Sequence, residues 1–280
     1  MNTIFKETEK ILKDANIEEY KAEGKMIVLG VSNLTMEEIL LLDEIPNKEK
    51  ILEIARKRAT TKAPLQHILG YCYFMGEKYK VNKNVLIPRD ETEILVEKAY
   101  NLIKNKNEKI NILDIGIGSG CISCALAKKL QNHDIEILGV DISLEALEIA
   151  LENINNLNLV RKVIIRKSDI FSKIRDFEKF DLIVSNPPYI PLSQKDSLES
   201  TVKDFEPHLA LFSDDEKGIN FYKKIIQNAK NYLKKDGFLA FELGINQSTE
   251  VKELLLNQGF KNIEIEKDLA GIERVILAKN

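Results

Sequence analysis

Apolar residues in the first 70 positions recur at intervals of three and four, which predicts amphipathic helices. Pro46 and Pro64 separate the helical segments. One helix is expected to begin at Thr35, whose side chain can cap it while Glu38 occupies the capping-box position. Residues 1–70 are therefore expected to form a small helical domain. Simple packing and docking of a partner are equally open roles for it.

The pattern changes at residues 71–87, where aromatic and β-branched residues surround a glycine. Tyr71, Tyr73 and Phe74 precede Gly76, and alternating apolar residues continue to Ile87. Apolar runs on both sides of a glycine-containing turn are typical of a β-hairpin. We expect this hairpin to link the helical domain to residues 88–280.

From residue 110 onward, short apolar runs alternate with segments of helical periodicity. Strands are predicted at 110–115, 135–140, 163–165, 182–184, 237–241, 263–265 and 274–278, and helices at 121–130, 143–155, 219–233 and 248–256. This alternation predicts an α/β fold, with a mostly parallel sheet and helices on both of its faces. Residues 190–216 are expected to form a long irregular loop, of the kind that often carries function.

Composition excludes several classes of function. The net charge of −3, with basic and acidic residues balanced over residues 1–80, argues against stable binding of nucleic acid or of an anionic membrane. No stretch approaches the roughly 18 apolar residues of a membrane span, and the start lacks the apolar core of a signal peptide. A cytoplasmic monomer is expected. Three cysteines are best read as reduced, and Cys121 and Cys124 as core residues of a helix; no metal is expected.

A glycine-rich loop follows the first strand of the predicted sheet. It reads Asp114-Ile-Gly116-Ile-Gly118-Ser-Gly120 and does not match the G-x-G-x-x-G/A pattern of dinucleotide-binding proteins. Glycines at alternate positions still allow the backbone to approach a ligand closely. A carboxylate at Asp114 disfavours a pyrophosphate and favours a cationic ligand.

Acidic residues also end the next two strands. Asp141 is placed to accept hydrogen bonds from ribose hydroxyls. Asp169 could accept from an adenine amino group, with Ile170 packing on the ring. Three acidic residues at consecutive strand ends, beside a glycine loop, indicate an adenosine-bearing ligand. S-adenosylmethionine, a sulfonium cation with an amino-acid tail, fits this description.

The fourth strand ends in Asn186-Pro187-Pro188-Tyr189. Two prolines stop the strand and stiffen the turn, so the side chain of Asn186 has few available directions. The Asn186 carboxamide oxygen and the Pro187 carbonyl are two adjacent acceptors, which suit an incoming NH2 group. Tyr189 offers a flat face on which a planar group could stack.

The glycine loop, Asp141 and Asn186–Tyr189 together resemble a class I S-adenosylmethionine-dependent methyltransferase, and more narrowly the PrmC/HemK family, which methylates the glutamine of the Gly-Gly-Gln tripeptide of peptide-chain release factors. The resemblance spans nearly the whole chain and includes Pro64–Gly70, Leu86–Glu93 and Phe205–Pro207. It implies a Rossmann-like sheet preceded by a helical domain and a hairpin linker, with a release factor as protein partner.

The resemblance also implies roles for individual residues. S-adenosylmethionine would be bound by Gly116, Ile117, Gly118, Ser119, Gly120, Asp141, Ile170 and Asn186, and the glutamine by Asn186, Pro187, Pro188 and Tyr189. Family members often carry an aromatic residue where this chain has Ile170, so stacking on adenine is expected to be replaced by aliphatic packing. Arg89 and Glu93 could line the cleft or brace the start of a helix in a salt bridge.

A carboxamide nitrogen is a poor nucleophile, and none of His67, His133 and His208 lies in a catalytic motif. Rate enhancement is therefore expected from positioning by Asn186 and Pro187. Methylation of an adenine amine in DNA uses a similar turn and is the alternative, but a basic face and a target-reading domain are not evident. A non-enzymatic adaptor would leave the glycine loop and Asn186 unexplained.

Overall fold

The structure, a computed structural model, describes residues 3–42 and 44–280; Met1, Asn2 and Asp43, which belong to the expected helical domain, lie outside the described residues. The chain divides into two compact units. Unit 1 consists of Met1–Tyr71 and Ser200–Phe205, and unit 2 of Cys72–Glu199 and Glu206–Asn280.

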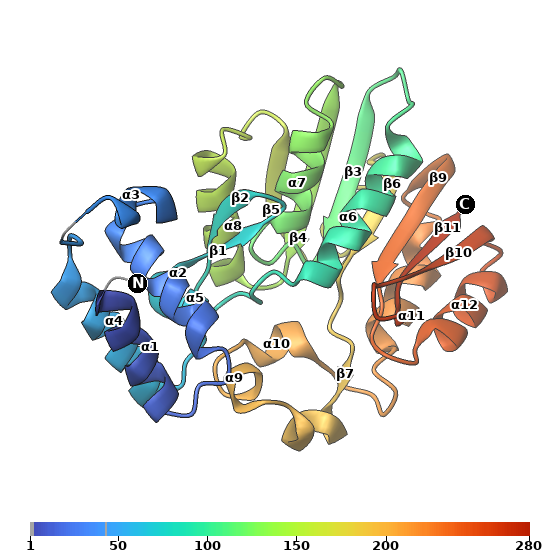
Figure 1. The fold of residues 1–280 in the computed structure, drawn as a ribbon. Coiled ribbons are helices and arrows are strands. Elements are labelled where there is room, and N and C mark those ends of the chain that lie inside the picture. Colours follow the sequence, from blue (N-terminus) through green and yellow to red (C-terminus); the bar gives the residue numbers. More distant parts are fainter. Residues whose placement is uncertain (1–2, 43) are drawn as a thin grey trace. The chain divides into compact units, whose positions relative to one another are not determined.

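Unit 1 is helical. Its helices are α1 (Thr3–Asp14), α2 (Tyr20–Ser32), α3 (Met36–Leu40), α4 (Lys48–Thr61), α5 (Leu65–Leu69) and α9 (Ser200–Lys203), and the first five appear in blue shades in Figure 1. The predicted capping box of α3 is confirmed: the Thr35 side chain accepts from the Glu38 N–H at 3.2 Å, and Glu38 accepts from the Thr35 N–H at 2.7 Å. The apolar faces of α1 to α5 meet in one core, which includes Ile4, Phe5, Leu12, Ile27, Ile39 and Ile51.

A partly buried ion pair braces unit 1. The guanidinium of Arg58 on α4 donates to both carboxylate oxygens of Glu23 on α2, each at 2.7 Å. The same guanidinium donates to the Lys62 carbonyl at 2.9 Å, which satisfies an acceptor at the end of α4. Such a two-pronged pair fixes the mutual orientation of two helices.

Unit 2 contains a seven-stranded sheet in the order β10-β11-β9-β6-β3-β4-β5. The strands are β3 (Ile110–Ile115), β4 (Ile135–Asp141), β5 (Val163–Lys167), β6 (Phe180–Ser185), β9 (Leu233–Glu242), β10 (Lys261–Lys267) and β11 (Glu273–Lys279). Strands β5, β4, β3, β6 and β9 run parallel, while β11 is antiparallel to both of its neighbours. Within this sheet, the chain first forms β3, adds β4 and β5 on one side of it, and then adds β6 on its other side. The direction in which strands are added therefore reverses between β3 and β6. Ligands of open α/β sheets bind at such a reversal, outside the carboxyl ends of the strands.

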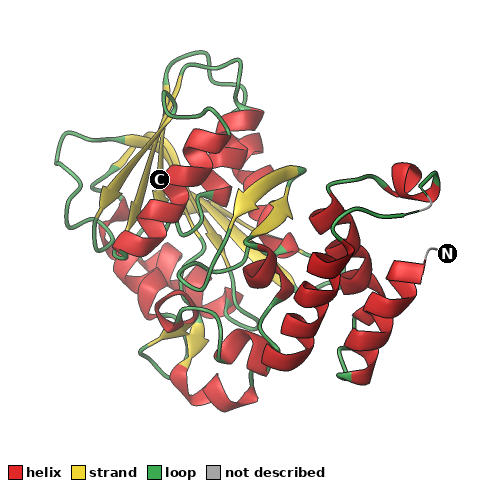
Figure 2. Ribbon diagram, turned by 90° about the vertical axis from the view of Figure 1, so that its left-hand side faces the viewer, coloured by secondary structure: helices red, strands yellow, loops and turns green. Residues whose placement is uncertain are grey.

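Helices cover both faces of the sheet, as predicted (Figures 1 and 2). One face carries α6 (Asp90–Ile103), α7 (Cys121–Lys129) and α8 (Leu144–Asn156), and the other carries α11 (Asn220–Ala229) and α12 (Ser248–Asn257). Strand β3 shows the alternation that produces these layers: Ile112 joins the core beneath α6 and α7, while Leu113 joins the core beneath α11 and α12. The predicted cap of α8 is confirmed, because the Ser143 side chain accepts from the Ala146 N–H at 3.1 Å.

The predicted hairpin is present but shorter than expected. Strands β1 (Tyr71–Phe74) and β2 (Glu77–Lys80) flank a turn at Gly76. The prediction that the strand pattern continues to Ile87 is wrong. Val81, Val85 and Ile87 lie outside any strand but are buried in the unit 2 core, so burial rather than pairing accounts for their apolar character.

Residues 190–216 are more ordered than predicted. They contain the short strands β7 (Ile190–Pro191) and β8 (Phe212–Ser213), which pair in parallel, and between them the 3-10 helix η1 (Leu192–Ser197), α9 and α10 (His208–Leu211). The predicted helix 219–233 ends early, at Ala229, because β9 starts at Leu233 beside Phe180. Across residues 3–42 and 44–280, a helix with the length and apolar character needed to cross a membrane is absent.

Candidate active site

A cavity of about 310 Å³ lies at the carboxyl ends of β3, β4, β5 and β6. Among the predicted site residues it is lined by Gly116, Ile117, Gly118, Ser119, Asp141, Asp169, Ile170, Asn186, Pro187 and Pro188. These residues come from four separate strand ends, which the sheet order gathers around the β3–β6 reversal. The cavity is thus where the fold alone would place a ligand.

The glycine loop turns tightly from β3 into α7. The N–H groups of Gly116 and Ile117 both donate to the Val140 carbonyl, at 2.8 and 2.9 Å. Gly116, Gly118 and Gly120 all have positive φ, at 76°, 54° and 82°, a backbone region that side chains disfavour. This explains the alternate glycines. Gly120 is the N-cap residue of α7 and faces Ala150 of α8, and it is not among the described residues that line the cavity.

Asp141 ties the end of β4 to the glycine loop. Its Oδ2 accepts from the Gly118 N–H at 3.0 Å, and its Oδ1 accepts from the Ser143 N–H at 2.9 Å. Burial raises the pKa of Asp141, and these backbone N–H groups oppose the rise. Because a carboxylate oxygen can accept more than one hydrogen bond, Asp141 keeps acceptor capacity toward the cavity it lines.

Asp114 occupies a different position from the one its motif suggested. Its side chain is fully buried and accepts a hydrogen bond from the Ser123 hydroxyl of α7 at 2.6 Å, while its Oδ1 has no partner among the described residues. Burial raises the pKa of Asp114 to about 7. Within the described chain it is not part of the cavity wall, so it supports the glycine loop from behind.

Asp169 and Ile170 line the cavity on a turn that follows β5. Ile170 has a φ of 49°, which is an outlier for a β-branched residue. The Ser168 hydroxyl stabilises this turn, because it donates to the Ile170 carbonyl at 2.9 Å and accepts from the Lys173 N–H at 3.0 Å. The turn therefore presents an aliphatic side chain at the cavity.

Asn186, Pro187 and Pro188 line the cavity directly after β6, as the strand-ending turn predicts. Tyr189 is not among the described lining residues. Its hydroxyl donates to Oε1 of Glu242 at 3.3 Å, and its carbonyl accepts from the Gln247 side chain at 2.9 Å. Burial raises the pKa of the Tyr189 phenol. These contacts fix the backbone that follows the two prolines.

Sequence reasoning missed two polar residues next to Asn186. Thr92, in the first turn of α6, lines the cavity, and its hydroxyl donates to Glu242 at 2.6 Å. Glu242 ends β9 and is 2% exposed. Both residues could have been found from the sequence. Thr92 lies inside the Leu86–Glu93 segment that resembles the family, and Glu242 is a further acidic residue at the end of a parallel strand.

Arg89 and Glu93 each make a polar contact near the start of α6. Arg89 pairs with the buried Glu206, which also accepts from the Ile87 N–H at 3.3 Å. This pair ties the segment before α6 to Pro207, which lines the cavity. Glu93 accepts from the Met75 N–H at 2.7 Å. The ion pair of Arg89 fits the bracing role that the sequence left open, whereas Glu93 accepts from a main-chain N–H and its role stays a prediction.

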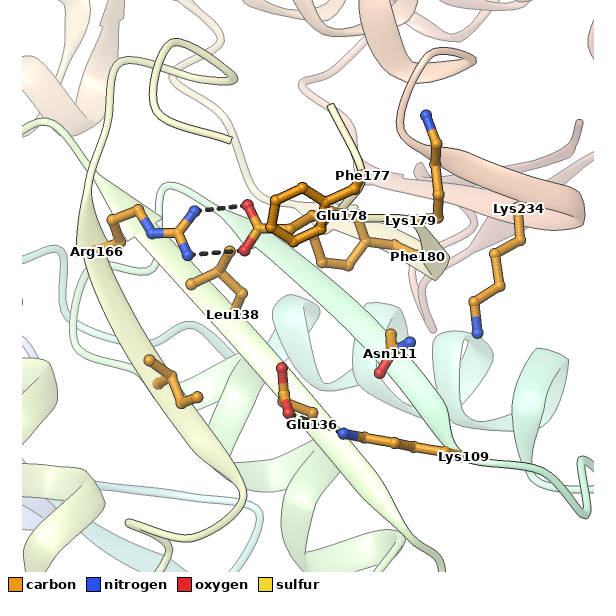
Figure 3. A pocket seen from close by; sticks show the side chains of 11 residues that line it. Lys109, Asn111, Glu136, Leu138, Arg166, Phe177, Glu178, Lys179, Phe180 and Lys234 are labelled. Atoms are coloured by element: carbon orange, nitrogen blue, oxygen red, sulfur yellow. Dashed lines mark hydrogen bonds and ion pairs between the residues drawn. The ribbon is translucent and has the colours of Figure 1, made fainter. Parts of the chain in front are cut away.

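A second hollow, of about 340 Å³, lies near the amino ends of the same strands (Figure 3). Its cations already have partners. Arg166 donates two hydrogen bonds of 2.8 Å to Glu178, Lys109 pairs with Glu136 at 2.9 Å, and Lys234 pairs with Asp181 at 2.7 Å. Paired charges at the amino edge of a sheet do not indicate a ligand site, so the first cavity is the candidate.

The buried positions of the cysteines agree with the core interpretation. Cys72, Cys121 and Cys124 are free and buried. Burial raises the pKa of Cys124 to about 12, so its thiol stays protonated and unreactive at neutral pH. A group of His, Cys, Asp and Glu residues able to hold a metal ion is absent from the part of the chain that the structure describes.

Comparison with known proteins agrees with the geometry. The model of the family "methyltransferase small domain" matches residues 90–205. A methyltransferase structure from Pyrococcus furiosus superposes with a TM-score of 0.51 at 18% identity, covering 82% of this chain and 98% of that one, which shows the fold.

Two curated relatives extend the match beyond the sheet. The release factor glutamine methyltransferase of Fusobacterium nucleatum is 44% identical over 233 residues, which is 83% of this chain and 64% of that protein. This chain thus spans slightly less than two thirds of that relative. The release factor glutamine methyltransferase of Clostridium acetobutylicum is 38% identical over 277 residues, 96% of this chain and 94% of that protein. With this identity over nearly the full length of both, the chain belongs to the family of release factor glutamine methyltransferases.

Proposed function

We propose that the protein transfers a methyl group from S-adenosylmethionine to the side-chain amide nitrogen of the glutamine in the Gly-Gly-Gln motif of a peptide-chain release factor. One observation carries the proposal: the Asn186-Pro187 turn opens onto the same cavity as the glycine loop and Asp141. A rigid acceptor pair for an NH2 group therefore lies beside a site with the character of a nucleoside pocket. Family membership supplies the substrate.

The residues present fit S-adenosylmethionine. The glycine loop allows close approach of the ligand, and Asp141 and Asp169 offer acceptors to ribose hydroxyls and an adenine amine. Ile117 and Ile170 give the aliphatic packing that an adenine ring needs. Lining carboxylates also suit a cation. When bound, the cofactor supplies an electrophilic methyl group on its sulfonium.

The protein's own contribution is to orient the glutamine amide. The carboxamide oxygen of Asn186 and the Pro187 carbonyl would accept its two amide hydrogens and turn the nitrogen lone pair toward the methyl donor. Orientation of this kind can be worth roughly 7–11 kcal/mol in model reactions. The same acceptors stabilise positive charge that develops on the nitrogen. A histidine is not among the described residues that line the cavity, which fits catalysis by positioning.

Unit 1 is proposed to dock the release factor. It is a separate compact unit with its own core, and it includes Leu41, which is 87% exposed. The alternative substrate, adenine in DNA, has no support from the curated relatives above, and the chain's net charge of −3 argues against it.

The test compares a purified release factor with duplex DNA as methyl acceptors, using labelled S-adenosylmethionine. Label should enter the release factor, and mass spectrometry should place one methyl group on the Gly-Gly-Gln glutamine. Replacing that glutamine in the factor should abolish labelling. Label in DNA, or on another residue of the factor, would contradict the proposal.

A further inference from the structure

Glu242 is the centre of a buried network that reaches Asn186. Its Oε2 accepts from the Thr92 hydroxyl at 2.6 Å, and its Oε1 accepts from the Tyr189 hydroxyl at 3.3 Å. The Thr92 oxygen in turn accepts from the Asn186 side-chain nitrogen at 3.4 Å. Thr92 and Glu242 are each 2% exposed, so the hydrogen bond between them is shielded from water. These hydrogen bonds connect the end of β9 and the start of α6 to the turn Asn186–Tyr189.

When Glu242 is ionised, the hydrogen-bond donors and acceptors of this network can be arranged in only one way. A threonine hydroxyl has a single hydrogen, and Thr92 directs it to the carboxylate of Glu242, the shortest bond of the set. Toward Asn186, the Thr92 oxygen can therefore only accept. Asn186 must present its NH2 group to Thr92, which leaves the carboxamide oxygen as the polar atom available to the cavity that Asn186 lines.

We infer that Thr92 and Glu242 are positioning residues that fix the direction of the Asn186 carboxamide, so that its oxygen rather than its nitrogen meets the glutamine amide of the substrate. The inference rests on the proposed function, because that function requires an acceptor at Asn186. An asparagine turned by 180° would present a donor to a donor and would repel the substrate NH2 group.

The charge on Glu242 sets the direction of the whole chain of hydrogen bonds. As a carboxylate it only accepts, so both hydroxyls must donate to it. A protonated Glu242 can donate to Thr92, whose hydrogen is then free to point at Asn186 and to select the inverted carboxamide. Burial raises the pKa of Glu242 to about 7, and the Thr92 and Tyr189 hydrogen bonds oppose this rise.

Other groups around Glu242 are included in this balance. Those facing it are Glu91 and Thr92 from α6, Arg274 from β11, Tyr189 from the turn and Tyr222 from α11. Glu91 raises the pKa of Glu242 and Arg274 lowers it, while the Tyr222 hydroxyl donates to the main-chain carbonyl at 2.9 Å. Since the ionised form is the competent one, turnover should fall as the pH drops through about 7.

The test measures kcat on a release factor from pH 5.5 to 8.5 for the full-length wild type, Thr92→Val and Thr92→Ser. Valine keeps the shape but removes the hydroxyl, so we expect kcat to drop about ten- to a hundredfold and its acid limb to flatten. Serine restores the hydroxyl and should restore both the rate and the acid limb. Calorimetry should show S-adenosylmethionine affinity unchanged within about threefold for both variants.

Ser248→Ala is the matched control, because Ser248 of α12 also donates to a glutamate, Glu273, within unit 2 but is not among the described residues lining the cavity. It should leave kcat and its pH profile unchanged. Thr92→Val with wild-type kcat and a wild-type acid limb, or a Thr92→Ser variant as impaired as Thr92→Val, would overturn the inference. A wild type that methylates no release factor at any pH would instead refute the proposed function.

Discussion

The Gly118 N–H donates to Oδ2 of Asp141 across 3.0 Å and joins the loop after β3 to the end of β4. The two residues are 23 positions apart in sequence. The contact means that Asp141 shapes the glycine loop as well as offering acceptors to the cavity. A ligand that donates a hydrogen bond to Asp141 is therefore also held next to the backbone of the glycine loop. Replacing Asp141 should consequently change both ligand affinity and protein stability.

Asp141→Ala should weaken S-adenosylmethionine binding by roughly 1.5–3 kcal/mol, because a charge-assisted hydrogen bond is lost. It also leaves the Gly118 and Ser143 N–H groups without their acceptor, so the melting temperature should fall. Isothermal calorimetry measures the first effect and thermal denaturation the second. Glu136→Ala, at the opposite end of the same strand, is the control and should bind normally. Equal affinity in both variants would contradict the role given to Asp141.

Asn186→Ala should lower kcat by about 10²–10³, the usual cost of losing one acceptor or donor aimed at the reacting group. Its effect on unfolding should be modest, because Asn186 is only half-buried and its side-chain hydrogen bond to Thr92 is long, at 3.4 Å. Asn186→Asp keeps an acceptor oxygen and should retain part of the activity. Mass spectrometry of the release factor provides the readout. An alanine variant with full turnover would exclude Asn186 as the positioning acceptor.

The sequence allowed accurate prediction of elements whose pattern is local. Buried strands read as short apolar runs, and the caps at Thr35 and Ser143 follow from side-chain chemistry within four residues. The four strand ends around the cavity could be predicted as well, because parallel strands bring their carboxyl ends to one edge.

Contacts between residues that are distant in sequence, and the direction of individual side chains, could not be predicted from local patterns. The membership of Ser200–Phe205 in unit 1 depends on contacts with residues more than 100 positions away, which no periodicity records. The inward position of Asp114 is a second case, since a strand-end acid can face the ligand or the neighbouring helix with the same local sequence. Ser123, nine positions on, decides between them by donating to the carboxylate.

Leu41→Ser tests unit 1 as the docking unit. Leu41 is 87% exposed, so the change should leave folding intact while removing apolar surface that a protein substrate could cover. KM for the intact release factor should rise about threefold to tenfold, with kcat on a short Gly-Gly-Gln peptide unchanged. The control is Leu269→Ser, a fully exposed leucine of unit 2. Identical kinetics for the two variants would argue against docking through this part of unit 1.

Asp114→Asn should change how stability depends on pH. Burial raises the pKa of Asp114 from its ordinary value of 3.8 to about 7 in the folded protein, and the nearby Asp141 carboxylate adds to the rise, while Ser123 opposes it. A carboxyl whose pKa is raised on folding favours the native state fully below its unfolded pKa, and this contribution is lost as the pH rises through the folded pKa. Asparagine does not titrate.

The stability of Asp114→Asn relative to wild type should therefore increase between pH 4 and pH 8, by up to a few kcal/mol, in urea unfolding of the cofactor-free protein. At pH 4 the two proteins differ only in whether an amide or a neutral acid fills the site. Ser123→Ala removes the hydrogen bond that favours the ionised form, so its deficit relative to wild type should be larger at pH 8 than at pH 4. A difference between Asp114→Asn and wild type that stays constant across this range would mean that Asp114 titrates as an ordinary carboxyl, and its place behind the glycine loop would then need a different electrostatic explanation.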